Sequence, residues 1–298
     1  MTKLETLFIM LEKSFVTTRT KVLCVIGYPI EHSMSPIMHN AAINELKLDF
    51  IYIAFNILPK NLSLAVKGFR TFNIMGINVT IPFKQKITKF LDEIEPTAQK
   101  IGAVNAIKNE EGYLIGRNTD AEGAMKAFVD AGYSIAGKNI LLLGAGGAAR
   151  AIAYITAKEA DKIVIANRTE KRAMKLANEL KKYSNTNIEG KNNSASVLKV
   201  ESKKTDILIN TTPVGMYPNV QLSPINAEFL HEDLIVYDIV YNPLETKLIK
   251  DAIKKGCKTI SGLDMLVNQG ALAFEWWTNK KPNVNIMKNK IIEFLGLK

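Results

Sequence analysis

Nine polar side chains, spread from residue 33 to residue 269, have the chemistry to hold a small polyhydroxylated ligand with an anionic group. Most of them follow an expected strand or precede an expected helix. They are Ser33, Ser35, Asn78, Thr80, Lys84, Asn105, Asp120, Tyr241 and Gln269. A purely structural interpretation stays equally open, because serine, asparagine and aspartate also cap helices and shape turns. In that interpretation Ser35, Asn118 and Asp120 merely cap helices, and Asn78 and Asn105 merely turn the chain.

A second chemical signal is the glycine-rich stretch 144–150. It follows the apolar run 140–143 and precedes an alanine-rich segment, residues 148–160, that we expect to be a helix. A buried strand, a glycine turn and a helix are the context of a dinucleotide-binding fingerprint. Gly144 would permit the tight turn, Gly146 would let the backbone approach a pyrophosphate, and Ala149 would allow close packing of helix on strand. The alternative is an ordinary glycine turn between a core strand and a core helix.

The end of the next strand indicates which dinucleotide would bind. NAD enzymes usually carry an acidic residue about 20 residues past the glycines, where it binds the ribose 2′-hydroxyl. Here that strand ends in Asn167-Arg168-Thr169, and no carboxylate appears before Glu170. Arg168 could pair with a 2′-phosphate or stack on adenine, and Arg172 and Arg150 could add positive charge. The sequence therefore predicts a preference for NADP, unless Arg168 is simply solvated.

The elements that must position these residues alternate between strand and helix in the first half of the chain. Strands are expected over 22–26, 50–56 and 76–80, with helices to about residue 46, after a Ser35 cap and Pro36, and over 61–71. Such alternation implies a parallel sheet with right-handed crossovers, so the polar residues that follow each strand gather at one edge. Residues 3–16 have the spacing of an amphipathic helix.

The second half repeats this alternation after a helix from Asp120 to about residue 131. Strands are expected over 162–166, 206–210, 234–240 and 258–260. The polar stretch 184–196 reads as a surface loop with room for one short strand, and helices are expected over 263–277 and 284–294. Ligand groups on separate halves would meet in a cleft, which we expect to narrow when ligands bind.

Composition limits the class of protein. The chain has 298 residues, 47% of them hydrophobic and 23% charged, which fits a soluble globular protein of two domains. It shows no apolar run of membrane-spanning length, no signal peptide and only two cysteines, so we expect a cytoplasmic protein without a metal site. The net charge of +10 comes mostly from scattered lysines without interleaved aromatics, which argues against nucleic-acid binding.

Eight short motifs, taken in order, resemble those of the shikimate dehydrogenase family. The resemblance runs from residue 22 nearly to the C-terminus. The motifs are Ser33-Met34-Ser35-Pro36, Asn78–Lys84, Gly102–Asn105, Asn118-Thr119-Asp120, Gly144–Arg150, Asn167-Arg168-Thr169, Asn210–Met216 and Gly262–Gln269. Eight ordered motifs are far more specific than one glycine pattern.

The resemblance implies an α/β fold of two domains. A substrate-binding domain with a mainly parallel sheet would comprise residues 1–120 and 262–298, with the C-terminal helices returning to it. A doubly wound Rossmann domain over residues 121–261 would bind NADP(H). The resemblance also implies the reversible NADPH-dependent reduction of 3-dehydroshikimate to shikimate, and it leaves room for a homodimer.

The family likeness assigns roles to individual residues. Ser33 and Ser35, helped by Tyr241, would bind the substrate carboxylate, and Lys84 and Asp120 would form the catalytic pair. Thr80, Asn105, Asp120 and Gln269 would hold ring hydroxyls, with Asn78 near the same site. The residues that would bind the cofactor are Gly144, Ala145, Gly146, Gly147, Ala148, Asn167, Arg168, Thr169, Arg172, Thr211, Thr212, Val214, Met216, Val240, Gly262 and Met265.

The proton chemistry favours one assignment within that pair. A lysine ammonium is a good proton donor and a poor base at neutral pH, and a nearby aspartate favours its charged form. Lys84 would therefore donate a proton in the reduction direction, and Asp120 would orient it. A purely binding role for Lys84 stays open.

Three other functions fit parts of the sequence. They are an NAD-using quinate/shikimate dehydrogenase of the same fold, another two-domain NADP enzyme such as a methylenetetrahydrofolate dehydrogenase, and a catalytically silent NADPH sensor. The polar cluster of the first half argues against the second, and the presence of Lys84 and Asp120 argues against the third.

Overall fold

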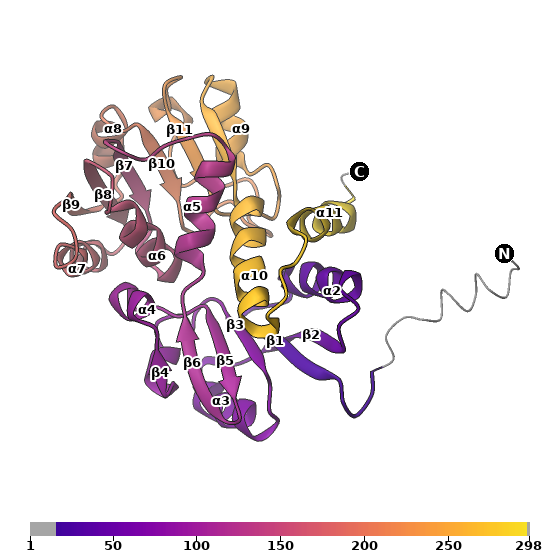
Figure 1. Cartoon of the computed structure of the whole chain (residues 1–298). Coiled ribbons are helices and arrows are strands. Elements are labelled where there is room, and N and C mark those ends of the chain that lie inside the picture. The colour runs from indigo at the N-terminus through magenta and orange to yellow at the C-terminus, as the bar shows by residue number, and fades with distance from the viewer. Residues whose placement is uncertain (1–15, 297–298) are drawn as a thin grey trace, which may run out of the picture. The chain divides into compact units, whose positions relative to one another are not determined.

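The computed structural model describes residues 16–296, which form two compact units (Figure 1). Unit 1 comprises the described residues up to Ile94, the segment Asn105–Arg117 and the described residues from Ala273 onward. Unit 2 comprises Glu95–Val104 and Asn118–Leu272. The amphipathic helix expected over residues 3–16 lies almost wholly outside the described residues.

Unit 1 is built on a six-stranded mixed sheet in the order β2-β1-β3-β5-β6-β4. The strands are β1 (Lys21–Gly27), β2 (Phe50–Asn56), β3 (Gly76–Val79), β4 (Glu93–Ile94), β5 (Ala106–Glu110) and β6 (Tyr113–Arg117). The pairs of β1 with β2 and with β3 are parallel, as the alternation predicted. The hairpin β5–β6 joins β3 in antiparallel fashion.

Three α-helices of unit 1 pack apolar side chains against this sheet or against each other. They are α2 (Ser35–Glu45), α3 (Leu62–Thr71) and α11 (Val284–Phe294), and α11 packs beside α2 (Figure 1). The long helix α10 (Gly262–Thr278) contributes residues to both units. From its C-terminal part, Trp277 donates its indole N–H to the Ile107 carbonyl at 2.9 Å.

Unit 2 is a six-stranded, fully parallel sheet in the order β12-β11-β10-β7-β8-β9. Its strands are β7 (Asn139–Leu143), β8 (Lys162–Asn167), β9 (Asn187–Asn192), β10 (Ile207–Asn210), β11 (Ile235–Asp238) and β12 (Lys258–Ser261). Counted from β7, this is the 3-2-1-4-5-6 order of a Rossmann fold, which binds nucleotides where the order reverses. The reversal lies between β7 and β10.

Helices cover both faces of this sheet, which explains the uninterrupted apolar runs of its central strands. They are α5 (Asp120–Asp130), α6 (Gly147–Thr156), α7 (Glu170–Leu180), α8 (Ala195–Ser202) and α9 (Lys247–Lys254), and α4 (Pro96–Ile101) packs against α6. Alternate residues of β7 enter different cores: Ile140 and Leu142 pack with α5, α6 and α7, whereas Leu141 and Leu143 pack with α8 and α9.

One local prediction was wrong, and one helix was not predicted. Ser35 does not cap α2, because the cap position is Met34 and Ser35 already belongs to the helix; the Ser33 hydroxyl instead accepts the Ser35 N–H at 3.3 Å. The polar stretch 184–196 contains the expected short strand, β9, but its end also begins α8, which the sequence did not suggest. Leu198 anchors α8 in the core of unit 2, and this tertiary burial outweighs the weak helical pattern.

Candidate active site

The nine polar residues divide between the two units. Six of them belong to unit 1: Ser33, Ser35, Asn78, Thr80, Lys84 and Asn105. Asp120, Tyr241 and Gln269 belong to unit 2, together with every residue predicted to bind the cofactor.

In unit 1, the loops that follow β1 and β3 are tied together at the carboxyl ends of these strands. The Thr80 N–H donates to the Ile26 carbonyl at 2.9 Å, and the Tyr28 N–H donates to the Ile81 carbonyl at 3.0 Å. A Cβ on Gly27 would lie only 2.6 Å from the Thr80 methyl group, so the approach requires a glycine. The segment that leads to Ser33 and the segment that leads to Lys84 therefore start side by side.

Lys84 is half-buried in the turn between β3 and the short helix Ile87–Phe90. Phe83 and Ile87, on either side of it, are fully buried. These two anchors fix the backbone of the turn, so the lysine is held on a rigid segment.

Asn78 and Asn105 are both buried and joined to each other. The Asn78 Nδ2 donates to the Asn105 carbonyl at 3.2 Å, and the Val79 N–H donates to the same oxygen at 2.8 Å. The Asn78 Oδ1 accepts the hydroxyl of Tyr52 at 2.7 Å. Both polar atoms of the Asn78 amide thus have partners inside unit 1, which favours a supporting role for Asn78 over direct ligand contact.

In unit 2, Asp120 opens α5 and is 3% exposed. A carboxylate in the first turn of a helix is favoured by the helix dipole. One turn later, a Cβ on Gly123 would lie 2.8 Å from the Gln269 backbone nitrogen, so α5 and α10 touch at this glycine. Asp120 and Gln269 therefore stand on two helices in direct contact. Tyr241 is half-buried and follows β11.

The glycine turn has the shape that a bound anion needs. Gly144 has φ of +111°, and a Cβ there would meet the Thr211 hydroxyl at 2.5 Å. At Gly146 a Cβ would meet nothing within 4 Å, so open space lies beside the exposed backbone. Helix α6 begins here without a side-chain cap, which leaves its first N–H groups for a ligand. Ala149 is fully buried against the sheet, as the fingerprint predicts.

The other predicted cofactor residues lie on loops at the same edge of the parallel sheet. Thr211, Thr212, Val214 and Met216 follow β10, and Val240 follows β11. Gly262 starts α10 where a Cβ would meet the Ile239 carbonyl carbon at 2.4 Å. The close approach at Gly262 excludes any other residue type.

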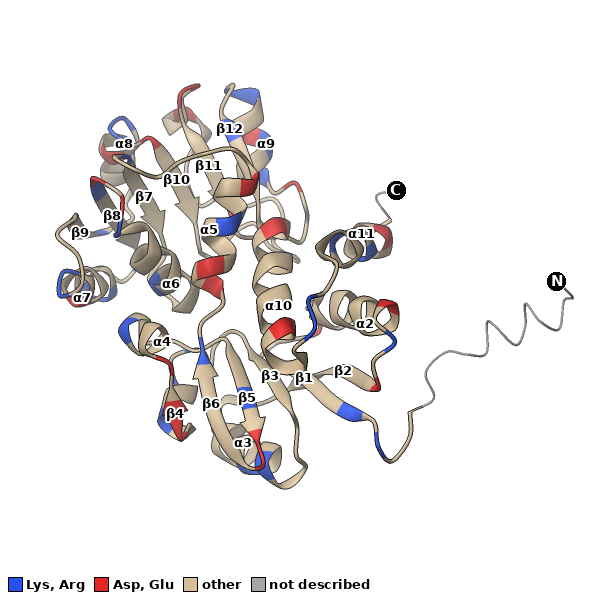
Figure 2. Cartoon of the chain, viewed as in Figure 1, with Lys and Arg blue, Asp and Glu red and all other residues tan. Residues whose placement is uncertain are grey.

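Arg168 and Arg172 are exposed at the start of α7, and Asn167 stabilises their turn by donating to the Thr169 carbonyl at 2.9 Å. Among residues 16–296, neither guanidinium has an ion pair. Figure 2 shows the basic positions of α7 in blue. Both arginines are therefore available to a phosphate.

The suggestion that Arg150 adds charge to this site was wrong. Its Nε donates to the Ile101 carbonyl at 2.6 Å, and its guanidinium pairs with Glu179. A Cβ on Gly102, in the left-handed conformation at the end of α4, would lie 2.7 Å from Arg150. Arg150 thus stabilises the carboxyl end of α4, where a cation is favoured by the helix dipole.

A buried polar network shapes the loops after β10 and β11, and the sequence did not reveal it. Asp238 accepts from Asn210 Nδ2 at 2.9 Å, from Thr246 Oγ1 at 2.6 Å and from the Val240 N–H at 3.1 Å. The Asn210 Oδ1 accepts the N–H and the hydroxyl of Thr212. Burial raises the pKa of Asp238 to about 6 against the lowering effect of these hydrogen bonds. Asn210 lay within a motif, but no spacing in the sequence links it to Asp238.

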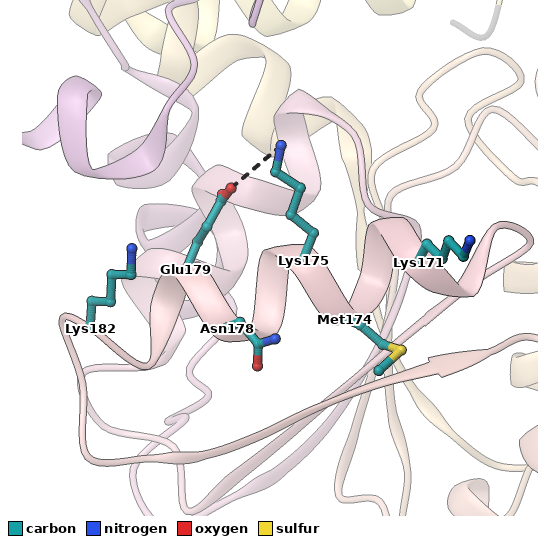
Figure 3. A pocket seen from close by; sticks show the side chains of 6 residues that line it. All are labelled: Lys171, Met174, Lys175, Asn178, Glu179 and Lys182. Carbon is teal, nitrogen blue, oxygen red and sulfur yellow. Dashed lines mark ion pairs between the residues drawn. The ribbon is translucent and has the colours of Figure 1, made fainter.

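An open hollow of about 420 Å³ lies along α7, and none of the predicted substrate residues lines it (Figure 3). It is lined by Lys171, Met174, Lys175, Asn178, Glu179 and Lys182. Lys175 and Glu179 form an ion pair across it at 4.0 Å. Exposed lysines on one helix and just beyond its end do not make a catalytic site, so we assign the hollow no part in the chemistry.

Three family models match successive parts of the chain. They are described as the shikimate dehydrogenase substrate binding domain, over residues 25–107, shikimate / quinate 5-dehydrogenase, over residues 124–215, and the shikimate 5′-dehydrogenase C-terminal domain, over residues 262–292.

Individual relatives match nearly the whole chain. The NADP(+) shikimate dehydrogenase of Methanocaldococcus jannaschii is 50% identical over 279 residues, which are 93% of this chain and 98% of the relative. A solved shikimate dehydrogenase in complex with NADP+ has a TM-score of 0.88 at 48% identity and covers 94% of this chain and 98% of its own. The enzyme of Thermus thermophilus, solved with NADP(H) and shikimate, has a TM-score of 0.82 at 35% identity, with 92% and 99% covered.

Proposed function

The chain belongs to the shikimate dehydrogenase family, and we infer that it catalyses the reversible NADPH-dependent reduction of 3-dehydroshikimate to shikimate. It is an oxidoreductase that uses NADP(H). One observation in the chain itself carries this inference: a glycine turn on a 3-2-1-4-5-6 parallel sheet is followed, one strand later, by Arg168 where NAD enzymes place a carboxylate.

The nucleotide is assigned to unit 2. The pyrophosphate is expected at the uncapped N-terminus of α6, against Gly144, Ala145, Gly146, Gly147 and Ala148. Arg168 and Arg172 neutralise the 2′-phosphate, with Asn167 and Thr169 shaping their turn. The loops that carry Thr211, Thr212, Val214, Met216 and Val240, and the start of α10 with Gly262 and Met265, support the remainder of the cofactor.

The substrate is assigned to the nine polar residues. Ser33 and Ser35, with Tyr241, bind its carboxylate, and Thr80, Asn105, Asp120 and Gln269 hold its hydroxyls. Asn78 supports Asn105 through the hydrogen bond that it donates to the Asn105 carbonyl, and Tyr52 holds the other end of its amide. The proposal includes the two domain roles expected from the sequence. Substrate binding is assigned to residues 1–120 and 262–298, and NADP(H) binding is assigned to residues 121–261.

The proton is handled by Lys84 and Asp120. When bound, the nicotinamide of NADPH supplies the hydride to the carbonyl carbon. The Lys84 ammonium donates one proton to the carbonyl oxygen, which becomes the hydroxyl of shikimate, and the reverse reaction returns that proton to Lys84. Asp120 orients the ammonium and accepts a substrate hydroxyl. The buried anchors beside Lys84 support a fixed position for its ammonium.

The experiment that tests this function is a direct assay of four combinations. Purified protein is mixed with NADP or NAD and with shikimate or quinate, and the absorbance of the reduced cofactor is followed. We expect the NADP and shikimate combination to be turned over most efficiently. Efficient turnover of quinate with NAD would instead establish the NAD-using alternative, and binding of NADPH without any turnover would establish a sensor.

Assembly and location are finer parts of the proposal. We propose a homodimer, which light scattering after size-exclusion chromatography tests. A cytoplasmic location is supported by Cys24 and Cys257, both of which are free thiols. Within residues 16–296, the structure has no helix of sufficient length and hydrophobicity to cross a membrane.

A further inference from the structure

A buried stack of aromatic rings lies in unit 1. It contains His39 from α2, Tyr52 from β2, and Phe274 and Trp277 from α10. The His39 and Tyr52 rings are stacked in parallel, with centroids 4.2 Å apart and an interplanar angle of 2°. The rings are tightly packed against the sheet, because a Cβ on Gly76 would lie 2.5 Å from the Trp277 ring. The plane of the Tyr52 ring is therefore fixed by its neighbours.

The backbone of Tyr52 is fixed as well. The Asn40 side chain accepts the Tyr52 N–H at 3.0 Å and donates to the Tyr52 carbonyl at 2.8 Å. Asn40 follows His39 on α2, so one helix holds both the ring and the main chain of Tyr52. β2 is an edge strand of the sheet, so the Tyr52 N–H and carbonyl on its open side have no neighbouring strand to pair with. The Asn40 side chain satisfies both groups.

The Tyr52 hydroxyl is the polar end of this rigid assembly. It donates to the Asn78 Oδ1 at 2.7 Å, which leaves the Asn78 Nδ2 to donate to the Asn105 carbonyl at 3.2 Å. Asn105 lies just before β5, which pairs with β3 so that Asn78 is opposite Ala106. The phenol thus dictates which way the Asn78 amide points, and the amide, together with the Val79 N–H, holds the Asn105 carbonyl.

We propose that Tyr52 is a positioning residue for substrate binding, which orients Asn78 and through it Asn105. This inference rests on the proposed function, because Asn105 is the residue that would hold a substrate hydroxyl. Without the phenol, the buried Asn78 Oδ1 loses its donor, and a buried acceptor without a partner is costly. Rotation of the amide to recover a partner would remove the hydrogen bond to Asn105.

His39 supports this role as an uncharged surface for the Tyr52 ring. Its two ring nitrogens have no hydrogen-bond partner among residues 16–296, although the side chain is fully buried. Burial lowers the pKa of His39 to about 3. The imidazole is therefore neutral throughout the pH range of an enzyme assay, and it acts on Tyr52 by stacking alone.

The test is Tyr52→Phe, which keeps the stacked ring and removes only the hydroxyl. We expect the KM for shikimate to rise about 5- to 20-fold, the scale of one lost buried hydrogen bond. The kcat should change less than about threefold and the KM for NADP should not change, since neither depends on Asn105. Isothermal titration calorimetry with shikimate should show the same loss of affinity. Tyr154→Phe, at a buried tyrosine of α6, is the matched control and should leave both KM values unchanged.

A double-mutant cycle adds a readout that a loss of general stability would not produce. In an Asn78→Ala background, Tyr52→Phe should raise the KM for shikimate no further, because its effect passes through the Asn78 amide. Additive effects of the two substitutions would contradict the inference. So would a Tyr52→Phe enzyme with a lower Tm but a shikimate KM within about twofold of the wild type.

The outcome also separates this inference from the proposed function. Wild-type protein that neither binds nor oxidises shikimate would overturn both. Wild-type protein that oxidises shikimate with NADP, beside a Tyr52→Phe variant of unchanged shikimate KM, would overturn only the role of Tyr52.

Discussion

Asn210 and Asp238 are joined side chain to side chain in the interior of unit 2, at the carboxyl ends of two adjacent strands. The Asn210 Nδ2 donates to the Asp238 Oδ1 at 2.9 Å, and neither residue is exposed to solvent. The opposite end of the Asn210 amide accepts both the N–H and the hydroxyl of Thr212. One side chain therefore connects the loop after β10 to the loop after β11, and both loops carry predicted cofactor residues.

We expect Asn210→Ala to weaken NADP binding. The substitution removes the link to Asp238 and leaves Thr212 without its partner, so the loop that carries Thr211, Thr212 and Val214 loses its fixed shape. The KM for NADP should rise about tenfold, which corresponds to one or two buried hydrogen bonds. Initial rates measured against NADP and against shikimate test this, and the KM for shikimate should change much less.

Asn226→Ala is the control for that experiment. Asn226 lies on the same β10–β11 connection, and its side chain accepts the Glu228 N–H at 3.1 Å to cap a short helix. It should change the Tm slightly and leave the KM for NADP unchanged. Equal effects of the two substitutions would mean that Asn210 has no special part in shaping the cofactor loop.

Asp238 gives unit 2 a definite pH dependence. Its pKa is raised from 3.8 to about 6 in the folded protein, mainly by burial. Between these values the folded state binds more protons than the unfolded state, so the contribution of Asp238 to stability falls as the pH rises from about 4 to about 6. Asp238→Asn removes this titration.

Urea unfolding at pH 4, 5, 6 and 7 measures the effect. The wild type should lose about 1–3 kcal/mol of unfolding free energy relative to Asp238→Asn over this range. Other groups titrate equally in both proteins and cancel in the difference. The difference in unfolding free energy between the two proteins could instead stay constant, or could favour the wild type as the pH rises. Either result would show that the pKa of Asp238 is not raised in the folded protein.

Arg168 should decide the choice between the two dinucleotides. Its guanidinium is exposed at the end of β8, where it can pair bidentately with a 2′-phosphate. Arg168→Ala should raise the KM for NADP much more than the KM for NAD, because NAD has no phosphate at that position. Equal use of both cofactors by the wild type would contradict this role. Lys171→Ala, on the exposed side of α7, is a control that keeps Arg168 and Arg172.

The sequence predicted the parts of the fold that depend on local patterns. The glycine turn, the central strands and the helices expected over 263–277 and 284–294, which are observed as α10 and α11, follow from apolar periodicity and turn residues. Polar residues at strand ends were also predictable, because parallel strands present their carboxyl ends at one edge. Helix α8 was missed, because its stability comes from the burial of Leu198 rather than from its Asn- and Ser-rich beginning.

What the sequence could not supply is the set of contacts between distant residues. Arg150 looked like a phosphate ligand because it follows the glycine turn, yet the Ile101 carbonyl and Glu179 engage it. Asp238 and Tyr52 showed no motif of their own, and only the fold brings them to Asn210 and Asn78. Supporting residues of this kind have no fixed spacing from the residues they hold.

The catalytic proposal makes the last prediction. Lys84→Met should lower kcat by at least about 10²-fold, the usual lower limit for a positioned proton donor. The KM for shikimate should change less, because Ser33, Ser35, Asn105 and Gln269 are still present to bind the ring substituents. The exposed neighbour Lys86 provides the control: Lys86→Met removes the same charge two residues away and should leave kcat unchanged.

Asp120→Asn should lower kcat and also weaken shikimate binding, since it removes both an orienting charge and an acceptor for a hydroxyl. The defects of Lys84→Met and Asp120→Asn should not add in the double variant, because the two residues are proposed to act as one unit. NADP affinity, measured by fluorescence titration, should survive in each variant, as neither residue belongs to the glycine turn or its neighbouring loops. If the two side chains only stabilised the fold, each substitution would leave kcat near normal. A Lys84→Met enzyme with normal kcat and a slightly lower Tm would therefore end the mechanistic proposal.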